Sequence, residues 1–401
     1  MIRKIFLTSA ILFIGFALYV STYYKSGINT LRPNPNNESI SYKSITEDLT
    51  NKRDYFTWIG QATILLNIDK KNILFDPIFS ERASPLKNIG PKRNIPPAIA
   101  INSLPKIDLI VISHNHYDHL DLQSLKEIQY KYPLVNIFVP KGDLRLLKSI
   151  GLKNISEFEW WENQSIFNFS VTFVPTKHWS ARGLFDRNKS LWGGWAIQSK
   201  SKTILHIGDT AYADYFKEFP LKLGKIDITF MPIGSYYPRD IEAEYHVDPY
   251  EAIQLARELE SKYTYGIHWG GIFFTQEPTY EPQKIVAQEM SLDSSLNFHT
   301  SIPGIIIDLP LKMYKKLVED WIKHYGIHCF LTMIVCTIDP VKKKYELRDN
   351  ILFIHKVIHL DAGNDYSFEK EINIMKQQLD IQLVSNEIIQ YTYDYDQGVI
   401  V

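Results

Sequence analysis

A cluster of metal-ligand side chains directly after an apolar run is the feature that most constrains this sequence. Residues 107–113 are nearly all apolar, as expected for a strand that is buried on both faces. Residues 114–119 then read His-Asn-His-Tyr-Asp-His. In a loop that leaves such a strand, the first two histidines can converge on one point while the aspartate and the third histidine face another. Imidazole and carboxylate ligands suit Zn²⁺ and similar ions, whereas Ca²⁺ takes oxygen ligands only. The pattern predicts a metal-binding loop, and the alternative is a polar surface loop whose histidines cap a helix.

Three further strand-like segments each end near a residue that can bind a metal. In chain order, these segments and residues are Val171–Val174 with His178, Thr203–Ile207 with Asp209, and Tyr265–Ile267 with His268. A glycine or a turn after each strand lets the backbone approach a common site closely. One histidine or aspartate at a strand end is more often a hydrogen-bonding residue than a ligand. Together with the His-rich loop, however, the three residues predict a shared metal site.

Strand-like and helix-like segments alternate through the first three quarters of the chain. Other apolar runs predict strands at Phe56–Ile59, Thr63–Ile68, Asn72–Phe75 and Ile226–Met231. Helical periodicity predicts helices at Leu120–Tyr132 and Pro249–Tyr263. This interleaving is typical of a layered α/β domain.

Composition and charge exclude several broad classes of protein. With 45% hydrophobic and 22% charged residues, the chain is a folded protein and not a disordered one. The 44 Lys and Arg residues nearly balance the 45 Asp and Glu residues, so there is no global basic field, and we expect no nucleic-acid partner. The only two cysteines, Cys329 and Cys336, exclude a disulfide scaffold.

An uncharged run from Ile5 to Tyr24 follows two basic residues near the N-terminus. As a helix, such a run is long enough to cross the ~30 Å hydrocarbon core of a bilayer. We expect an uncleaved signal-anchor helix over residues 1–24, with a cleaved signal peptide as the alternative. The positive-inside rule then places the rest of the chain outside the cytoplasm, in the periplasm or an equivalent compartment. The protein would be membrane-anchored in the first case and secreted in the second.

The remainder of the chain divides into three predicted parts. Residues 25–50 are rich in turn-forming and polar residues and are expected to form a linker. Residues 51–310 contain the predicted metal ligands and their strands. Residues 311–401 hold helix-like and strand-like segments without a ligand cluster. We expect them to form a small α+β appendage that mediates oligomerisation or binds a partner.

The order of the ligand residues resembles that of the metallo-β-lactamase superfamily of two-metal hydrolases. The pattern His-x-His-x-Asp-His is followed along the chain by a histidine, by Gly-Asp-Thr and by another histidine. Further segments between Phe56 and Pro282 are similar to the N-acyl-phosphatidylethanolamine-hydrolysing phospholipase D branch of that superfamily. These segments are Trp58–Thr63, Phe75–Pro85, Gly90–Arg93, Ile112–Asp121, Leu191–Trp195, Pro232–Tyr236 and His246–Pro249.

The resemblance implies an αββα sandwich, in which two mixed sheets pack face to face with helices outside and the metals at one edge. It also implies two divalent metal ions, expected to be Zn²⁺, and a specific set of ligands. One ion would be held by His114, His116 and His178. The other would be held by Asp118, His119 and His268. Asp209 would bridge the two ions.

The implied reaction is a hydrolysis in which the two ions lower the pKa of a bridging water and hold it as hydroxide. Asp209 and His246 are the expected catalytic residues. His246 would contact the substrate phosphate or protonate the leaving alcohol, unless it only caps the helix that follows it. Asp76 and Asp248 are expected to accept hydrogen bonds from ligand imidazoles, although Asp76 could instead serve a turn.

The expected substrate is a phospholipid, in particular N-acyl-phosphatidylethanolamine, which would suit an enzyme anchored in a membrane. Gln61, Tyr236 and Trp269 are expected to contact this substrate, although the branch usually has histidine at the position of Gln61. A basic loop over residues 82–93 could meet anionic headgroups, or it could be a solvated turn.

Two other functions are compatible with the same residues. A two-metal hydrolase of a lactone or a cyclic phosphodiester would use the same ions on a different bond. A non-catalytic binding protein would use the metals only for stability, but structural zinc sites are usually closed sets rich in cysteine. The sequence therefore favours a metal-dependent hydrolase.

Overall fold

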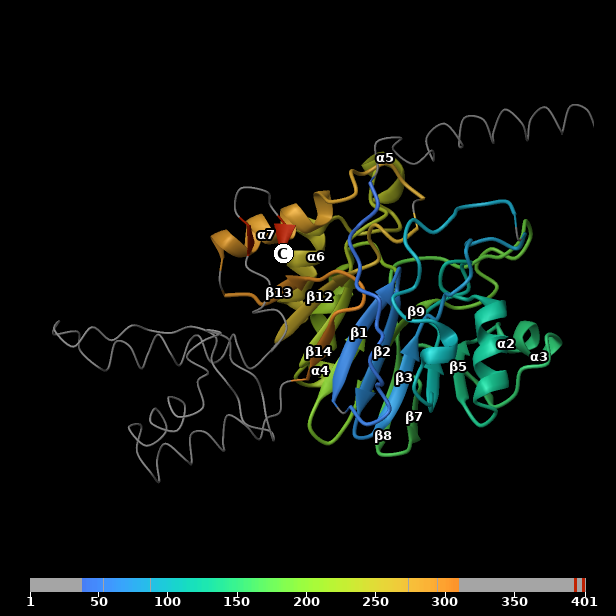
Figure 1. The fold of residues 1–401 in the computed structure, drawn as a ribbon. Helices are drawn as coiled ribbons and strands as arrows, with labels where there is room; N and C mark the ends of the chain where they lie inside the picture. Colours follow the sequence, from blue (N-terminus) through green and yellow to red (C-terminus); the bar gives the residue numbers. More distant parts are fainter. Residues whose placement is uncertain are drawn as a thin grey trace, which may run out of the picture. The chain divides into compact units, whose positions relative to one another are not determined.

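The computed structural model describes residues 38–309, apart from positions 53, 87, 273 and 294, together with residues 393–394 and 399–400 (Figure 1). The chain separates into two compact units, residues 1–305 and residues 306–401. The predicted metal ligands all belong to the first unit.

The first sheet of this unit begins as an antiparallel meander and continues as parallel strands. Its neighbouring strands are, in order, β1 (Tyr55–Gly60), β2 (Thr63–Ile68), β3 (Lys71–Phe75), β4 (Leu109–Val111), β5 (Asn136–Pro140) and β6 (Ile155–Phe158). Asp69 and Lys70 join β2 to β3, both with positive φ, as the tight turns that match the twist of paired strands require. The crossovers between the parallel strands carry η1 (Ile101–Ser103), α2 (Leu122–Lys131) and α3 (Leu144–Ser149).

The second sheet has the same mixed character. Its strand order is β13 (Phe298–Thr300), β12 (Tyr263–Ile267), β11 (Ile228–Pro232), β10 (Thr203–His206), β9 (Gly193–Gln198), β8 (Phe169–Pro175) and β7 (Asn163–Ile166). Strands β7 to β10 pair antiparallel, and β10 to β13 pair parallel. The intervening helices are η2 (Asp214–Glu218), α4 (Phe219–Leu223), α5 (Arg239–Glu242), α6 (Pro249–Glu258) and α7 (Glu281–Leu292).

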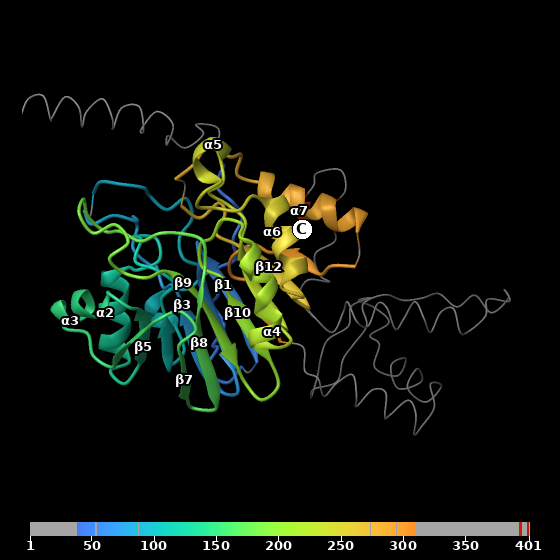
Figure 2. The same ribbon diagram turned by 180° about the vertical axis from the view of Figure 1, so that it is seen from behind.

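Buried aromatic side chains join the two sheets face to face. Phe56 of β1 contacts Phe230 of β11 with ring centroids 4.9 Å apart. Phe158 of β6 contacts Trp195 of β9 at 5.1 Å. On the outside, α6 packs against β11 and α7 against β13, while α3 lies by β6 (Figures 1 and 2). The expected αββα sandwich is therefore confirmed.

The predicted elements agree with the structure except at some of their ends. The strand predicted at Thr63–Ile68 has those bounds, whereas the strand predicted at 107–113 is reduced to the three residues of β4. The helix predicted at Pro249–Tyr263 ends at Glu258. The chain reverses at Glu260, which has a φ of 49°, and this reversal lets the next segment join the sheet as β12.

The prediction of a linker is wrong for residues 38–50, because this segment packs against the rest of the first unit. Ile40 and Leu49 are each only 2% exposed. The backbone N–H of Ile45 donates to the carbonyl of Ala98 at 2.8 Å. The polar composition of this segment favoured a linker, but its apolar residues Ile40, Ile45 and Leu49 are buried. Their burial holds the segment in place without a helix or strand.

Several predictions fall on residues outside the described ranges. These are the anchor helix at residues 1–24, the first half of the linker, and nearly all of the appendage at 311–401. Among the described residues, no helix combines the length and apolar character needed to cross a bilayer. In the second unit, Tyr393–Asp394 (β15) and Val399–Ile400 (β16) pair antiparallel.

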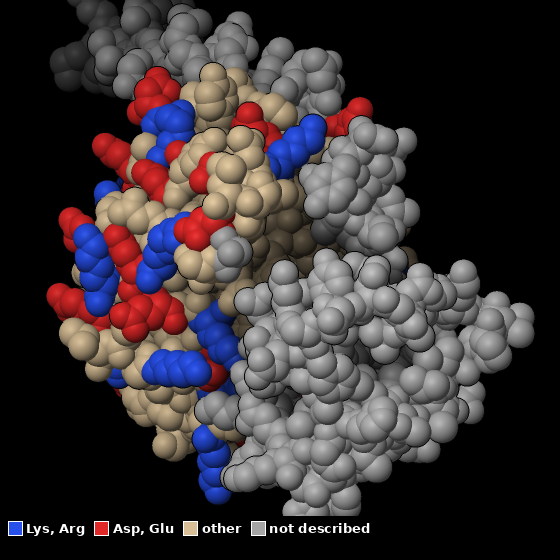
Figure 3. Space-filling view, turned by 90° about the vertical axis from the view of Figure 1, so that its left-hand side faces the viewer, with Lys and Arg blue, Asp and Glu red and all other residues tan. Residues whose placement is uncertain are grey.

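Positive and negative side chains are interspersed on the face of the described domain shown in Figure 3, which is seen from the left of Figure 1. That face therefore offers no extended field of one sign.

Candidate metal centre

Four strand ends bring the predicted ligands to one edge of the sandwich. The ligand loop, residues 114–119, follows β4, and the other three ligands follow β8, β10 and β12. Gly208 lets the end of β10 approach this loop, because a Cβ there would lie 2.6 Å from the Cβ of Ser113. The approach therefore requires glycine at this position, which also has a positive φ of 69°.

The first group of ligand atoms consists of three imidazole nitrogens. The distance from His114 Nε2 to His116 Nδ1 is 2.8 Å. The distance from His178 Nε2 to the same His116 atom is 3.2 Å. All three donors can therefore reach one ion, as the resemblance implied.

The second group consists of two imidazoles and two carboxylates. His119 Nε2 and His268 Nε2 lie 3.2 Å apart, and they are 3.4 and 3.3 Å from Asp118 Oδ2. Asp209 Oδ2 lies 3.1 Å from His119 Nε2. These four side chains form a second set that can hold an ion.

Asp209 also faces the first group. Its Oδ2 atom is 3.8 Å from His178 Nε2 and 3.9 Å from His114 Nε2. Its carboxylate is buried, at 3% exposure. Asp209 therefore lies between the two sets of donors, in the position expected of a residue that bridges two ions.

The hydrogen bonds behind the first group test whether it fits a metal. His178 donates from Nδ1 to the carbonyl oxygen of Tyr245 at 2.9 Å, so in a neutral ring Nε2 carries a lone pair. Burial, together with the neighbouring imidazoles, holds the pKa of His114 and of His116 well below its usual range, and burial lowers the pKa of His178 to about 4. Three neutral rings that direct nitrogen atoms at one point fit a bound cation.

The carboxylates of the second group also attract positive charge. Burial alone would raise the pKa of Asp209, but the nearby imidazoles of His119 and His268 hold it well below its usual range. Burial alone would lower the pKa of His119, but Asp209, Asp118 and Asp76 raise it well above its usual range. Both shifts show that the second group attracts positive charge, as a cation site requires.

Asp76 supports the ligand loop as expected. Its carboxylate accepts a hydrogen bond from His119 Nδ1 at 2.7 Å. It also accepts from the backbone N–H and the hydroxyl of Ser113, at 2.7 and 2.6 Å. These contacts orient the ring of His119 so that Nε2 faces the second group. No pattern in the sequence indicated the part played by Ser113.

The expected role of Asp248 is wrong. Its side chain accepts from the backbone N–H of Glu251 at 2.9 Å and forms a capping box with that residue at the start of α6. It therefore stabilises a helix end, and the acceptor that holds His178 is instead a backbone carbonyl.

His246 lies beside both groups of ligands and does not cap α6. Its ring centroid is 5.1 Å from that of His178 and 5.8 Å from that of His268, and its Nδ1 atom is buried without a hydrogen-bond partner. Burial is the main cause that lowers its pKa to about 3. A neutral ring can donate one hydrogen bond to a phosphate oxygen, which is the first of the two roles expected of His246.

Gln61 contacts the ligands themselves. Its Nε2 atom donates to Asp118 Oδ2 at 3.0 Å and lies 3.0 Å from His268 Nε2, while its Oε1 atom accepts from the backbone N–H of Ile272. With 1% exposure, Gln61 can position the second group but offers little surface to a substrate.

The other two expected substrate contacts point elsewhere. Tyr236 is 5% exposed, and its hydroxyl donates to Glu281 at 2.5 Å. Trp269 is 2% exposed and packs on Trp58 with ring centroids 5.6 Å apart. Both belong to the packing behind the site, so the prediction that they contact substrate does not fit their burial.

A different aromatic residue lies beside the first group. The half-buried ring of Trp179 contacts His116 with centroids 4.3 Å apart, and the guanidinium of Arg187 lies 4.2 Å from the centre of the Trp179 ring. Tryptophan directly after His178 was a visible signal in the sequence. Arg187 carried no signal of its own.

Comparisons with known proteins agree with this geometry. A model of the beta-lactamase superfamily domain matches residues 71–269. The chain is 35% identical over 226 residues to N-acyl-phosphatidylethanolamine-hydrolyzing phospholipase D 1 of Caenorhabditis elegans. The aligned region covers 54% of this chain and 64% of the relative. Over 239 residues it is 37% identical to the mitochondrial N-acyl-phosphatidylethanolamine-hydrolyzing phospholipase D of Saccharomyces cerevisiae, covering 57% of this chain and 50% of the relative.

The fold is also similar to that of a solved structure. Isothiocyanate hydrolase from Delia radicum gut bacteria matches 63% of this chain and 98% of its own length, with a TM-score of 0.52 and 19% sequence identity. That likeness concerns the fold alone. The chain spans between half and two thirds of the length of the two phospholipase D relatives.

Proposed function

We propose that this chain, which is similar to the metallo-β-lactamase superfamily and to its N-acyl-phosphatidylethanolamine-hydrolysing branch, is a metal-dependent hydrolase of phospholipid phosphodiesters. The observation that carries this proposal is the position of Asp209. Its Oδ2 atom lies 3.1 Å from His119 in one donor set and 3.8 Å from His178 in the other. Two adjoining sets that share a carboxylate are the arrangement that a two-metal hydrolase needs.

The residues around the donors have separate tasks in this proposal. Two divalent ions, proposed to be Zn²⁺, would lower the pKa of a water molecule and offset the negative charge of a phosphodiester. Asp76 and the carbonyl of Tyr245 fix the orientations of His119 and His178. His246 donates a hydrogen bond to a phosphate oxygen. Gln61 holds Asp118 through its amide.

N-acyl-phosphatidylethanolamine is the specific substrate that we propose, by analogy with the names of the two relatives. A water molecule adds to phosphorus, and the bond between phosphorus and the headgroup oxygen breaks. The products are phosphatidic acid and an N-acylethanolamine, whose oxygen takes up a proton. No serine or cysteine nucleophile is needed for this reaction.

The test combines metal analysis with a panel of substrates. Purified full-length chain should contain about two equivalents of a divalent metal, and chelation should remove both metal and activity. The panel contains N-acyl-phosphatidylethanolamine, a lactone and a cyclic phosphodiester. Hydrolysis of the lactone or the cyclic diester without the phospholipid would favour a two-metal hydrolase of another substrate. Less than half an equivalent of metal in an active preparation would contradict the metal centre.

A pair of histidine variants separates the site from the fold. His116→Ala should lose metal and turnover, because it removes the nitrogen that faces both His114 and His178. His299→Ala is the matched control, since this histidine packs on Tyr265 in the sheet and belongs to neither donor set. Equal losses in both variants would point to unfolding and not to a metal ligand.

We further propose that the chain is anchored in a membrane through residues 1–24, with the hydrolase domain outside the cytoplasm. The support is the uncharged run after two basic residues in the sequence. A reporter fused after Val401 should be active only outside the cytoplasm, and full-length protein found soluble in the cytoplasm would contradict this topology. Residues 311–401 are proposed to mediate oligomerisation, which the mass of the protein in solution with and without them would test.

A further inference from the structure

Two loops at one end of the sandwich present large apolar side chains to solvent. We call residues 80–93 and residues 180–190 the paired loops, because they extend side by side in Figure 1, drawn in cyan and green, and again in Figure 2. Exposed fractions of 55%, 65%, 83% and 86% are found for Leu86, Ile89, Leu184 and Phe185. The apolar residues of both loops therefore belong to one surface.

Hydrogen bonds hold the tip of the second loop outward. The carboxylate of Asp186 accepts from the backbone N–H of Gly183 at 2.8 Å and from that of Arg182 at 3.1 and 3.2 Å. Leu184 and Phe185 lie within this closed turn. The hydrogen-bonded turn therefore keeps both side chains exposed to water. This exposure is unfavourable for apolar groups, which would be more stable if they packed on the core.

The first loop is closed near its base in a similar way. The backbone N–H of Ala83 donates to the carbonyl of Pro91 at 3.0 Å, and the guanidinium of Arg82 donates to the carbonyl of Gly90 at 2.5 Å. Gly90 has a positive φ of 103°, and a Cβ there would lie 2.6 Å from the Cβ of Ser84. The two apolar residues of this loop lie between these contacts, at its far end.

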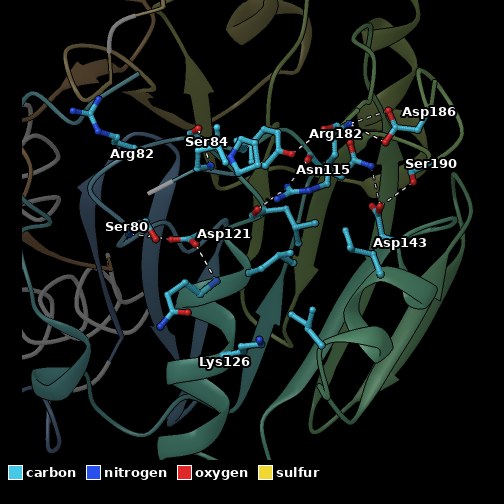
Figure 4. A pocket seen from close by; sticks show the side chains of 18 of the residues that line it. Ser80, Arg82, Ser84, Asn115, Asp121, Lys126, Asp143, Arg182, Asp186 and Ser190 are labelled. Carbon is cyan, nitrogen blue, oxygen red and sulfur yellow. Dashed lines mark hydrogen bonds between the residues drawn. The ribbon is translucent and has the colours of Figure 1, made fainter. Parts of the chain in front are cut away.

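The paired loops adjoin the metal centre. A cavity of about 1020 Å³ lies between the two loops and the helices α2 and α3, and Figure 4 shows Arg82, Arg182, Asp186 and Asn115 around it. Arg182 Nη1 donates to the carbonyls of Asn115 and Leu120 at 2.8 Å each. Since Asn115 stands between two metal ligands, Arg182 joins the second loop directly to the ligand loop.

Charge indicates what the exposed tips contact. The paired loops contain seven Lys and Arg residues but only two acidic residues, although the whole chain has a formal net charge of -1. Arg93 is buried and Arg182 bonds the ligand loop, which leaves five basic residues against two acidic ones. Apolar side chains flanked by cations suit the interface of an anionic bilayer, where the apolar groups leave water and the cations meet headgroups. A protein partner would explain the apolar tips alone. The positive excess therefore favours a lipid surface.

We propose that the paired loops dock the hydrolase domain onto an anionic phospholipid surface, next to the metal centre. This inference deepens the proposed function and rests on it for the substrate, but docking is measured without turnover. Burial of one leucine or phenylalanine strengthens binding at least about tenfold. Each basic side chain near an anionic surface adds about fivefold.

The experiment uses the full chain reconstituted into vesicles, with an environment-sensitive fluorophore on Leu86→Cys. Cys329 and Cys336 are replaced by serine so that only this cysteine is labelled. In vesicles that contain phosphatidylglycerol, the emission should shift to the blue and be quenched by brominated lipid. The double variant Leu184→Ser/Phe185→Ser in the other loop should lower the insertion equilibrium at least about a hundredfold. Leu221→Ser is the matched control, because Leu221 is 87% exposed on α4.

Several outcomes would overturn the proposal. The first is an unchanged emission wavelength in anionic vesicles. The second is a loss of insertion in Leu221→Ser equal to that in the double variant. The third is an emission shift that requires added protein and not lipid, which would indicate a protein partner. Hydrolysis of a short soluble phosphodiester separates docking from catalysis: the double variant should keep it while losing activity on vesicles. If wild-type chain hydrolyses no phosphodiester but still inserts, the proposed function fails and the docking surface stands.

Discussion

Replacing Asp76 by asparagine tests the architecture of the metal centre most directly. Asp76 accepts three hydrogen bonds, from His119 Nδ1 and from the backbone N–H and hydroxyl of Ser113. Asparagine has nearly the same shape but only one acceptor oxygen. If that oxygen accepts from the backbone N–H of Ser113, the amide NH₂ faces His119. The imidazole must then move its proton to Nε2, the atom that faces the second donor group.

The expected loss concerns the second metal ion. His119 Nε2 lies 3.1 Å from Asp209 and 3.4 Å from Asp118, and these carboxylates belong to the second group. Losing the hydrogen-bond acceptor behind a ligand histidine typically weakens metal affinity by about 10- to 100-fold. This factor corresponds to about 1.4 to 2.7 kcal/mol. The first group should keep most of its affinity, since neither Asp76 nor His119 supplies one of its ligand atoms. Only His114 is linked to Asp76, through the hydroxyl of Ser113.

The assay is a titration of metal-free protein with Zn²⁺ in competition with a chromophoric chelator, which resolves the two binding steps. Asp121→Asn is the matched control, since this buried aspartate caps α2 and accepts from the backbone N–H of Ser80 at 2.9 Å. Asp76→Asn should weaken one step and Asp121→Asn neither. Wild-type affinity for both equivalents in Asp76→Asn would refute the argument that Asp76 sets the orientation of His119.

Three other predictions follow from the same structure. Asp209→Asn should lower turnover by about 10²- to 10³-fold, because it removes the charge shared by both donor groups; a near-normal rate in metal-replete variant would rule out the bridging role. Burial raises the pKa of Asp143 from 3.8 to about 6. The folded state then binds this proton more tightly than the unfolded state, so the contribution to stability is complete below pH 3.8 and is lost as the pH rises through about 6. Urea unfolding should show a loss of about 3 kcal/mol over this interval that Asp143→Asn lacks, and equal pH profiles would contradict it. Arg182→Gln should weaken metal affinity by about tenfold, because it removes hydrogen bonds to the ligand loop, whereas Arg145→Gln, at an exposed position on α3, should not change it. Unchanged metal affinity in Arg182→Gln would show that these bonds do not position the ligands.

Local patterns in the sequence were sufficient to single out the candidate metal ligands. Three histidines and an aspartate in residues 114–119 can converge in a loop, because six residues span at most about 20 Å. The resemblance to a known superfamily supplied the partition into two groups, which the described geometry matches. Apolar runs such as Thr63–Ile68 predicted strands well, since alternation and burial act on neighbouring residues.

Positions far apart in the chain could not be assigned in the same way. Gln61 meets Asp118 across 57 positions, and Arg182 meets Asn115 across 67. Trp269, next to a metal ligand in sequence, points into the core against Trp58. The neighbours of these side chains depend on how the two sheets pack, and local sequence patterns do not predict that packing.

The sequence by itself indicated a layered α/β domain, the candidate metal ligands and the order in which strands deliver them, because hydrophobic period and ligand type are properties of short segments. The family resemblance added the αββα sandwich. Only the tertiary structure decided what surrounds those ligands. It placed Asp76 behind His119, assigned Asp248 to a helix cap, buried Tyr236 and Trp269, and brought two loops about a hundred residues apart to one exposed surface. The physical reason is that hydrogen bonds, burial and pKa values depend on distances through space, which are set only when both sheets close on a common core.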